Sequence, residues 1–331
     1  MRVLVAGGAG YIGSHAVKAL RTAGHDVVVL DDLSAGHPEA VPGVPLVRAR
    51  VHDTAAARAA LREHGIEAVM HFAAWLAVGE SVRDPGKYYE NNVTGSLRLF
   101  DAMVAEGVGM CVFSSTCAVY GEPVTLPLAE DHPHAPVNAY GESKLVVERA
   151  LGHYGRAHGL RAIALRYFNA AGADPEGALG EDHDPEIHLI PLAIDAARGG
   201  APLQVFGLDY PTPDGTCQRD YVHVMDLADA HVRALDALAA GHGGGAYNVG
   251  TGRPWSVREV LDTVGRVVGR PVAWTPAPRR AGDPSALYAA SGRIQADLGW
   301  RPVRSDLATI VADAAAWRAA HPGGYRAIVS R

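Results

Sequence analysis

A tyrosine and a lysine four residues apart could remove a proton from a substrate hydroxyl. Tyr140 and Lys144 lie in the segment NAYGESKLVVERAL, and the i, i+4 spacing places both side chains on one face of a helix. A free phenol has a pKa near 10 and needs nearby positive charge to act as a base at neutral pH. One such charge about 5 Å away contributes roughly 3 kcal/mol, or about two pKa units. The pair predicts general acid–base chemistry on a hydroxyl, the alternative being an exposed helical pair without a catalytic role.

Thr116 is the third candidate for this chemistry. It follows the apolar segment 110–114 within FSSTCAVYG, which we expect to form a strand of a parallel sheet. The carboxyl ends of such strands are where these sheets bind ligands. A threonine hydroxyl there can bond the reacting oxygen and orient the proton that is transferred.

A glycine-rich turn predicts a dinucleotide site. The segment VLVAGGAGYIGS spaces Gly7, Gly10 and Gly13 three residues apart. The spacing suits a tight turn, a close approach of pyrophosphate to the backbone, and close packing of a helix on a strand. Asp31 follows the next apolar run, where a carboxylate would accept bonds from both ribose hydroxyls and repel a 2′-phosphate. We expect NAD rather than NADP, although a glycine loop without ligand and a turn-forming aspartate are the alternatives.

Alternating apolar and helical segments must position these residues. Short β-branched runs alternate with longer Ala- and Leu-rich stretches, which predicts a parallel sheet covered by helices on both faces. The fold class is therefore α/β, a Rossmann-type doubly wound parallel sheet with a smaller mixed α/β C-terminal substrate lobe. The predicted strands are 3–6, 27–30, 46–49, 68–72, 110–114 and 162–166, and the predicted helices are 12–23, 55–64, 88–106 and 140–158.

The composition of the chain changes after residue 169. Glycine and proline become dense and the elements shorten, as in GADPEGALGEDHDPE, which is typical of a second lobe. We expect residues 1–170 to form the NAD-binding domain and residues 171–331 the substrate lobe, with a segment of about 220–250 returning to the first domain. The cleft between the two is the expected ligand site.

The composition limits the partners and the setting. A net charge of -6 with scattered arginines argues against nucleic acid, and no apolar run approaches the roughly 18 residues of a membrane span. Three cysteines without metal-ligand spacing suit a reducing cytoplasm. Asp182, His183, Asp184 and His188 are residue types that could bind a metal, but their loop context and a complete mechanism without metal lead us to expect none.

Over nearly its whole length the chain resembles the UDP-galactose 4-epimerases of the extended short-chain dehydrogenase/reductase group. The matching segments are VLVAGGAGYIGSH, HFAAWLAVGES, YYENNVTGSLRL, FSSTCAVYGEP, AYGESKLVVE, LRYFNAAGA, FGLDYPTPDGTCQRDYVHVMDLADAH, YNVGTG and APRRAGDP. The resemblance implies a UDP-glucose/UDP-galactose 4-epimerase with tightly bound NAD. It implies cofactor contacts by Gly7, Gly10, Tyr11, Ile12, Gly13, Asp31, Asp32, Arg50, Val51, Phe72, Ala73, Ala74, Asn91, Tyr140, Lys144 and Phe168.

The resemblance also implies how the UDP-hexose is held and how the chain assembles. The substrate residues it implies are Thr116, Asn169, His188, Leu189, Phe206, Arg219, Arg280, Asp283 and Leu287. Similar enzymes commonly form homodimers through helices equivalent to residues 92–106 and 140–158. The apolar side chains of Leu97, Phe100, Val146 and Leu151 could serve that contact or could equally face the sheet.

The chain departs from the usual pattern of that family at several positions. Arg50 replaces an acidic residue that bonds the adenine amino group, and a guanidinium could stack on the ring instead. Leu76 stands where some members carry a lysine, and His188 where some carry an asparagine. Leu287 replaces a bulkier tyrosine beside C2 of the sugar, so we hypothesise that N-acetylated UDP-sugars also fit.

Other functions on the same fold remain as alternatives. A 4,6-dehydratase needs an acidic pair where this chain has Cys117 and Ala118, which argues against it. A reductase would consume NADH in stoichiometric amounts, whereas an epimerase needs no net redox partner. A specialised epimerase of a modified UDP-sugar and a binding protein without catalysis are the remaining possibilities.

Overall fold

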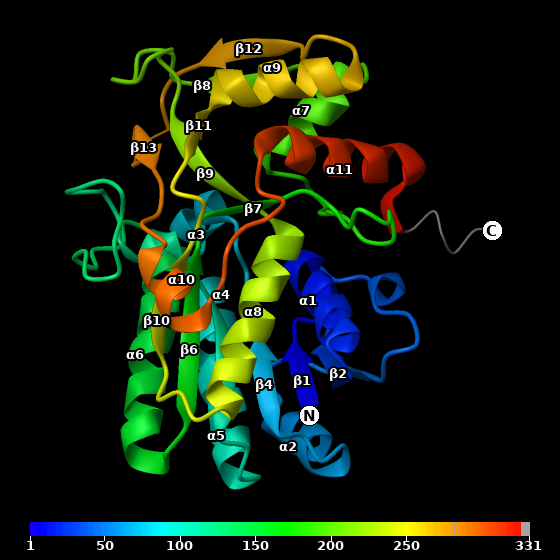
Figure 1. The fold of residues 1–331 in the computed structure, drawn as a ribbon, viewed down its shortest axis with the longest axis vertical. Helices are drawn as coiled ribbons and strands as arrows, with labels where there is room; N and C mark the ends of the chain where they lie inside the picture. The colour runs from blue at the N-terminus through cyan, green and yellow to red at the C-terminus, as the bar shows by residue number, and fades with distance from the viewer. Residues whose placement is uncertain (281, 326–331) are drawn as a thin grey trace.

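A parallel sheet of seven strands forms the body of the molecule (Figure 1). The computed structural model describes residues 1–280 and 282–325. The strand order is β10-β6-β5-β4-β1-β2-β3, and every neighbouring pair is parallel. The strands are β1 (Arg2–Ala6), β2 (Asp26–Asp31), β3 (Leu46–Arg48), β4 (Ala68–His71), β5 (Met110–Thr116), β6 (Arg161–Tyr167) and β10 (Gly245–Val249).

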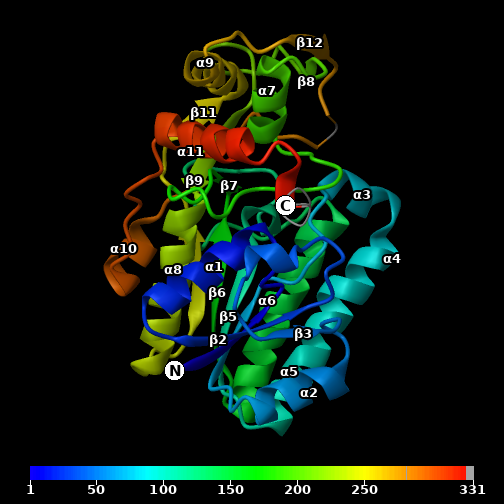
Figure 2. The same cartoon turned by 90° about the vertical axis from the view of Figure 1, so that its right-hand side faces the viewer.

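Helices cover both faces of this sheet, which is why its strands are apolar on both sides. In β1, Val3 and Val5 pack into the cluster under α1 and α8, while Leu4 and Ala6 pack into the cluster under α2, α5 and α6. Figure 2 shows α1 and α8 on one side and α2, α5 and α6 on the other. These helices are α1 (Tyr11–Thr22), α8 (Val224–Ala239), α2 (Thr54–Glu63), α5 (Gly95–Ala105) and α6 (Ala139–His158).

The predicted α/β sheet is confirmed, with two differences of detail. The six predicted strands all form, and a seventh, β10, joins the sheet beside β6 after the chain has left it. The predicted helix 88–106 is interrupted by a π-helical turn. Its parts are α4 (Pro85–Tyr88), η2 (Tyr89–Thr94) and α5.

Two of the apolar residues considered for a dimer contact face the interior instead. Phe100 is fully buried and Leu151 is 5% exposed, and both belong to the cluster between α5, α6 and the sheet. Leu97 packs against the same cluster. Packing in the core of one chain therefore accounts for the apolar character of these side chains.

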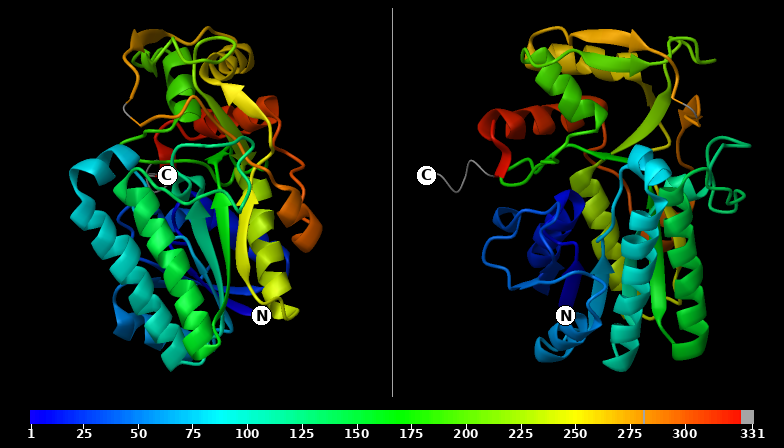
Figure 3. Two further views of the ribbon diagram at one scale, coloured as in Figure 1. Left: turned by 90° about the vertical axis from the view of Figure 1, so that its left-hand side faces the viewer. Right: turned by 180° about the vertical axis from the view of Figure 1, so that it is seen from behind.

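The second lobe lies beyond the carboxyl ends of the long strands (Figures 1 and 3). Its core is an apolar cluster between α7, α9, α11 and the short strands. β9 pairs with β11, β13 and β7, and β8 pairs with β12. The elements are β7 (Asn169–Ala171), α7 (Leu189–Ala197), β8 (Leu203–Phe206), β9 (Gln218–His223), β11 (Pro254–Ser256), α9 (Val257–Val268), β12 (Trp274–Ala277), β13 (Ala286–Leu287) and α11 (Leu307–Ala320). The helix α10 (Gly292–Leu298) returns to the long sheet and packs against β10 and α8.

Short elements complete the chain. The single-turn helices are η1 (Pro38–Ala40), α3 (Val78–Arg83) and η3 (Cys117–Val119). Among the helices of the described residues, none has the length and apolar character needed to cross a membrane.

Candidate active site

Tyr140 and Thr116 meet where α6 begins beside the end of β5. Asn138 caps α6 by accepting a hydrogen bond from the backbone N–H of Gly141 at 2.8 Å, so Tyr140 lies in the first turn. Thr116 is the last residue of β5, and its hydroxyl lies close enough to the phenol of Tyr140 to lower the pKa of that phenol. The structure therefore brings together two residues that are 24 positions apart in the sequence and that were both predicted to act on a hydroxyl.

Gly141 makes this approach possible and was missed by the sequence analysis. A Cβ at Gly141 would lie 2.6 Å from the backbone oxygen of Ala118. Any larger residue would push α6 away from the loop that follows Thr116. The signal was present in the sequence as the glycine next to Tyr140.

Lys144 is buried one turn further along α6. It is 3% exposed, and its Nζ donates a hydrogen bond to the backbone oxygen of Ser114 at 2.8 Å. Burial lowers the pKa of Lys144 to about 7, although the carboxylate of Glu148 opposes this shift. The ammonium therefore lies inside the site rather than in solvent, as the catalytic role requires.

Burial has the opposite effect on Tyr140. It raises the pKa of the phenol well above the ordinary value, and Tyr167 adds to the rise, while the nearby hydroxyl of Thr116 lowers it. The expected activation combines Lys144 with an oxidised nicotinamide, and it stays a prediction.

A buried polar network fixes the other side of α6. Asn92, 2% exposed, accepts a hydrogen bond from the backbone N–H of Trp75 at 2.9 Å and donates one to the hydroxyl of Ser143 at 3.1 Å. Asn92 lies in the π-helical turn η2, and such turns frequently occur at functional sites. Sequence reasoning found its neighbour Asn91 but missed Asn92 and Ser143, because the helical pattern did not reveal the π turn.

The glycine-rich turn leaves the first turn of α1 open to an anion. Gly7 has a φ of +78°, and a Cβ there would lie 2.5 Å from the backbone nitrogen of Ala73. A Cβ at Gly13 would lie 2.1 Å from the oxygen of Gly7, so α1 is held tightly against the turn. Gly10, at the N-cap position, provides no side-chain cap for the backbone N–H groups of α1. These unpaired donors at a helix N-terminus fit a pyrophosphate.

Asp31 is positioned by two backbone bonds at the end of β2. One carboxylate oxygen accepts from the N–H of Ala9 and the other from the N–H of Leu33, both at 2.9 Å. Each oxygen keeps a further lone pair for a ribose hydroxyl. Asp32 beside it forms an ion pair with Arg50 at 3.7 Å. The arginine that departs from the family pattern is thus held at the adenosine end of the predicted groove.

The remaining predicted cofactor residues follow the same edge of the sheet. Phe72 and Ala73 each donate a backbone hydrogen bond to the oxygen of Ala6, which places them beside the glycine-rich turn. Phe168 is 8% exposed and lies in the cluster that contacts Leu287 and Cys117. The others lie at the start of α1, after β4, after β3 and in η2: Tyr11, Ile12, Ala74, Val51 and Asn91.

Four of the predicted substrate residues form two contacts in the second lobe. Arg219 of β9 forms an ion pair with Asp283, and its side chain is 12% exposed. The guanidinium of Arg280 lies 3.9 Å from the ring centroid of Phe206. Two arginines and an aromatic ring in one place suit a diphosphate and a planar base.

Leu287, Asn169, Leu189 and His188 extend this surface. Leu287 is the β13 partner of Arg219 in the sheet register. Asn169 opens β7 and Leu189 opens α7. His188 precedes α7, and its Nδ1 lies 2.7 Å from Glu181 and 3.0 Å from Glu186. Its predicted contact with the sugar phosphate therefore stays a prediction, because two carboxylates already surround the ring.

Comparison with known proteins agrees with this arrangement. Residues 3–250 match the NAD dependent epimerase/dehydratase family. The chain is 50% identical over 316 residues to UDP-glucose 4-epimerase of Rhizobium meliloti, covering 95% of this chain and 96% of the relative.

Solved structures give the same result. A UDP-glucose 4-epimerase from Brucella ovis in complex with NAD has a TM-score of 0.93 at 50% identity, covering 95% of this chain and 97% of that one. The Bifidobacterium longum enzyme in complex with NAD+ and UDP has a TM-score of 0.93 at 37% identity, covering 98% and 100%. The chain belongs to the NAD dependent epimerase/dehydratase family and, within it, to the UDP-glucose 4-epimerases.

Proposed function

We propose that the chain interconverts UDP-glucose and UDP-galactose with NAD as its resident cofactor. The observation that carries the proposal is that Thr116 and Tyr140 lie together, with Lys144 buried and bonded to Ser114, at the sheet edge that also carries the open first turn of α1. Relatives over nearly the whole chain carry the same function in their names.

The glycine-rich turn and Asp31 would hold the cofactor. The N–H groups at the start of α1 would bind its pyrophosphate, and the Asp31 carboxylate would bind the adenosine ribose. When bound, NAD supplies a hydride acceptor that takes hydrogen from C4 of the hexose and returns it.

Tyr140 would remove the proton of the C4 hydroxyl. Thr116 would bond the same oxygen and orient its proton toward Tyr140. Lys144 would keep a positive charge close to the phenol, fixed by its bond to Ser114. The resulting 4-keto sugar turns about its diphosphate link and receives the hydrogen on the opposite face. Tyr140 then returns the proton.

The second lobe would hold the UDP part while the hexose turns. Arg219 and Arg280 would form charge-assisted bonds with the diphosphate, and Phe206 would lie against the uracil. Binding energy placed in UDP lets the sugar present either face without loss of the substrate.

A direct test uses the purified protein with UDP-galactose and no added cofactor. We expect UDP-glucose to form until equilibrium is reached, with no net change in NADH absorbance. Consumption of NADH in proportion to product would identify a reductase instead, and absence of product with NAD present would reject the proposal.

The domain roles, the assembly and the setting are further parts of the proposal. Residues 1–170 would hold the cofactor and 171–331 the substrate, with 220–250 returning to the first domain; the pairing of β10 with β6 supports this. A homodimer through α5 and α6, which lie side by side in Figure 3, is tested by light scattering. The three cysteines are free thiols, which suits a cytoplasmic protein.

A further inference from the structure

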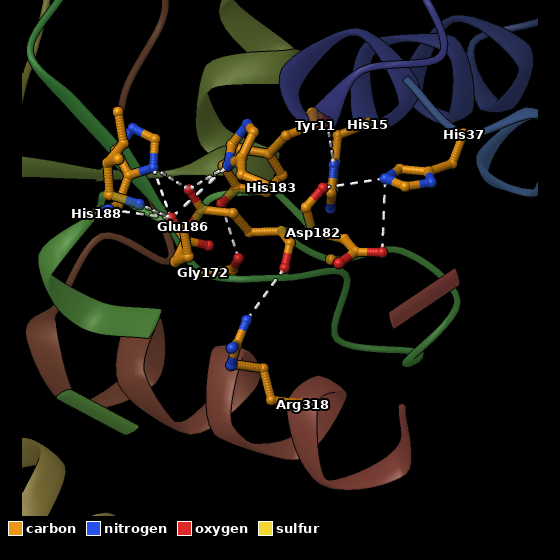
Figure 4. A network of polar contacts seen from close by, with 12 residues as sticks. Tyr11, His15, His37, Gly172, Asp182, His183, Glu186, His188 and Arg318 are labelled. Carbon is orange, nitrogen blue, oxygen red and sulfur yellow. Dashed lines mark hydrogen bonds and ion pairs between the residues drawn. The ribbon is translucent and has the colours of Figure 1, made fainter. Parts of the chain in front are cut away.

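Two histidines and two glutamates converge in the segment between β7 and α7. Glu181, His183, Glu186 and His188 each offer a ligand atom, and these four atoms lie within 4.8 Å of one another. Figure 4 shows the side chains of His183, Glu186 and His188 turned toward one another, beneath Tyr11 of α1. None of the four belongs to the proton-transfer group.

The spacing of the donor atoms suits a metal ion. Nδ1 of His183 lies 3.2 Å from Glu181 and 3.8 Å from Glu186, and Nδ1 of His188 lies 2.7 Å and 3.0 Å from the same two carboxylates. A tetrahedral zinc ion with ligand bonds of 2.0–2.1 Å separates its donors by about 3.4 Å. Small adjustments of the side chains would bring all four to that distance.

Several of these atoms are buried without an aligned hydrogen bond. Oε1 of Glu181, Nδ1 of His183 and Oε2 of Glu186 are buried and lack a hydrogen-bond partner of acceptable geometry. The side chain of Glu181 is only 6% exposed. Nδ1 of His188, in contrast, is hydrogen-bonded to Oε1 of Glu186 at 3.0 Å.

The same four residues could instead be a closed ion-pair network. Burial alone lowers the pKa of His183, but the nearby carboxylates of Glu181 and Glu186 outweigh it and raise that pKa to about 9. Two protonated imidazoles would balance two carboxylates. An ion-pair network would leave Oε2 of Glu186 buried without a hydrogen-bond partner.

We propose that Glu181, His183, Glu186 and His188 bind one divalent first-row transition metal ion, with zinc as the best match to two imidazoles and two carboxylates. Four protein ligands leave no open position, so the ion is structural and takes no part in catalysis. This departs from the expectation that the chain binds no metal.

The structure also shows which residues of this segment are excluded from the site. Asp182 lies 3.5 Å from the imidazole of His37 and accepts a hydrogen bond from the backbone N–H of Tyr325 at 2.8 Å. The cluster contains His183 and His188 of the sequence-based candidates, together with Glu181 and Glu186.

The ion would tie the second lobe to the cofactor turn. The rings of His183 and Tyr11 meet edge to face, with centroids 6.2 Å apart. The hydroxyl of Tyr11 donates to the backbone oxygen of Gly172 at 2.7 Å. Fixing residues 181–188 would therefore hold the start of α1 and the start of α7 in one arrangement.

Metal content measured by mass spectrometry tests the proposal without reference to turnover. We expect the full-length protein, dialysed against 1 equivalent of Zn²⁺ and then metal-free buffer, to keep about one zinc per chain. Removal with a chelator should lower the melting temperature by roughly 5 °C, and zinc alone should restore it. Cobalt in place of zinc should give the strong visible absorption of a tetrahedral ion.

Variants separate metal binding from general damage. Glu186→Gln and His183→Asn should lose most of the bound zinc and the effect of the chelator. His37→Asn, which removes the imidazole that contacts Asp182 outside the cluster, should keep both. Should the wild-type protein keep no zinc and melt at the same temperature with and without chelator, the four residues are an ion-pair network and the proposal is overturned.

Discussion

Nζ of Lys144 donates a hydrogen bond to the backbone oxygen of Ser114 at 2.8 Å, which joins α6 to β5 inside the candidate active site. The ammonium is thereby fixed beside the residue two positions before Thr116, whose hydroxyl lowers the pKa of Tyr140. One helix and one strand end thus position all three proposed catalytic residues.

Replacing Tyr140 with phenylalanine removes the proposed base and keeps its ring. We expect the rate of UDP-galactose conversion to fall by roughly 100- to 10,000-fold, while the bound NAD content stays unchanged. Tyr154→Phe, in the same helix but bonded to Asp101 at the surface, is the matched control and should keep full activity. Equal activity in both variants would remove Tyr140 from the mechanism.

Replacing Gly13 with alanine should prevent cofactor binding. The new Cβ would lie 2.1 Å from the oxygen of Gly7, so the glycine-rich turn must open. We expect purified Gly13→Ala to contain little NAD by absorbance and to melt at a lower temperature. Gly152→Ala in α6, where a Cβ meets only the end of the Arg156 side chain at 3.7 Å, should retain NAD. Its free energy of unfolding should rise by up to about 1 kcal/mol, because alanine favours the helix more than glycine does.

Asp31→Asn should weaken the hold on the adenosine ribose. Both carboxylate oxygens are oriented by backbone N–H groups, and an amide replaces one acceptor with a donor. A hydrogen bond to a charged group contributes about 1.5–3 kcal/mol. Losing that contribution should weaken the affinity for NAD roughly 10- to 100-fold. Titration calorimetry on protein freed of cofactor measures this, with Asp53→Asn at the cap of α2 as control.

The pKa of Lys144 predicts how stability depends on pH. Burial lowers that pKa to about 7 from 10.5 in the unfolded chain. Between pH 7 and 10 the unfolded chain therefore binds more protons at this residue, so its contribution to folding free energy becomes more favourable as pH rises. Urea unfolding of wild type and Lys144→Met should show the stability difference moving in favour of wild type over that interval. A difference that does not change with pH would contradict the buried position.

Leu287 predicts tolerance of N-acetylated sugars. It lies opposite Arg219 in the β9–β13 pair and contacts the cluster that holds Phe168. We expect wild type to convert UDP-N-acetylglucosamine, and Leu287→Tyr to lose at least about tenfold of that activity while converting UDP-galactose normally. Leu287→Met conserves volume and should behave as wild type. No turnover of the acetylated sugar by wild type would reject the idea.

The cofactor half of the chain was predictable because local patterns determine it. The apolar runs of β1, β2, β4 and β5 and the glycine spacing of residues 7–13 each identify an element from a few neighbouring residues. The pairing of Arg219 with Asp283, 64 residues away, was not predicted, since no local pattern encodes a contact across a lobe. The family resemblance implied only that each of them contacts the substrate.

Other features depend on surroundings that a sequence does not display. The burial that raises the pKa of Tyr140 is one of them; ionisation of the phenol by Lys144 together with an oxidised nicotinamide stays a prediction. The gathering of Glu181 and Glu186 around His188 depends on how residues 172–188 fold back toward α1. The sequence of Tyr89–Thr94 has no pattern that distinguishes its π-helical turn from an ordinary α-helix.

The strand β10 reaches the long sheet only after the chain has passed through β7, α7, β8 and β9 of the second lobe. A fragment cut after residue 170 would leave the edge of β6 with unpaired backbone groups, which are templates for aggregation. Neither lobe can therefore be produced by simple truncation, and transplanting the cofactor half onto another protein would require a designed strand to cover that edge.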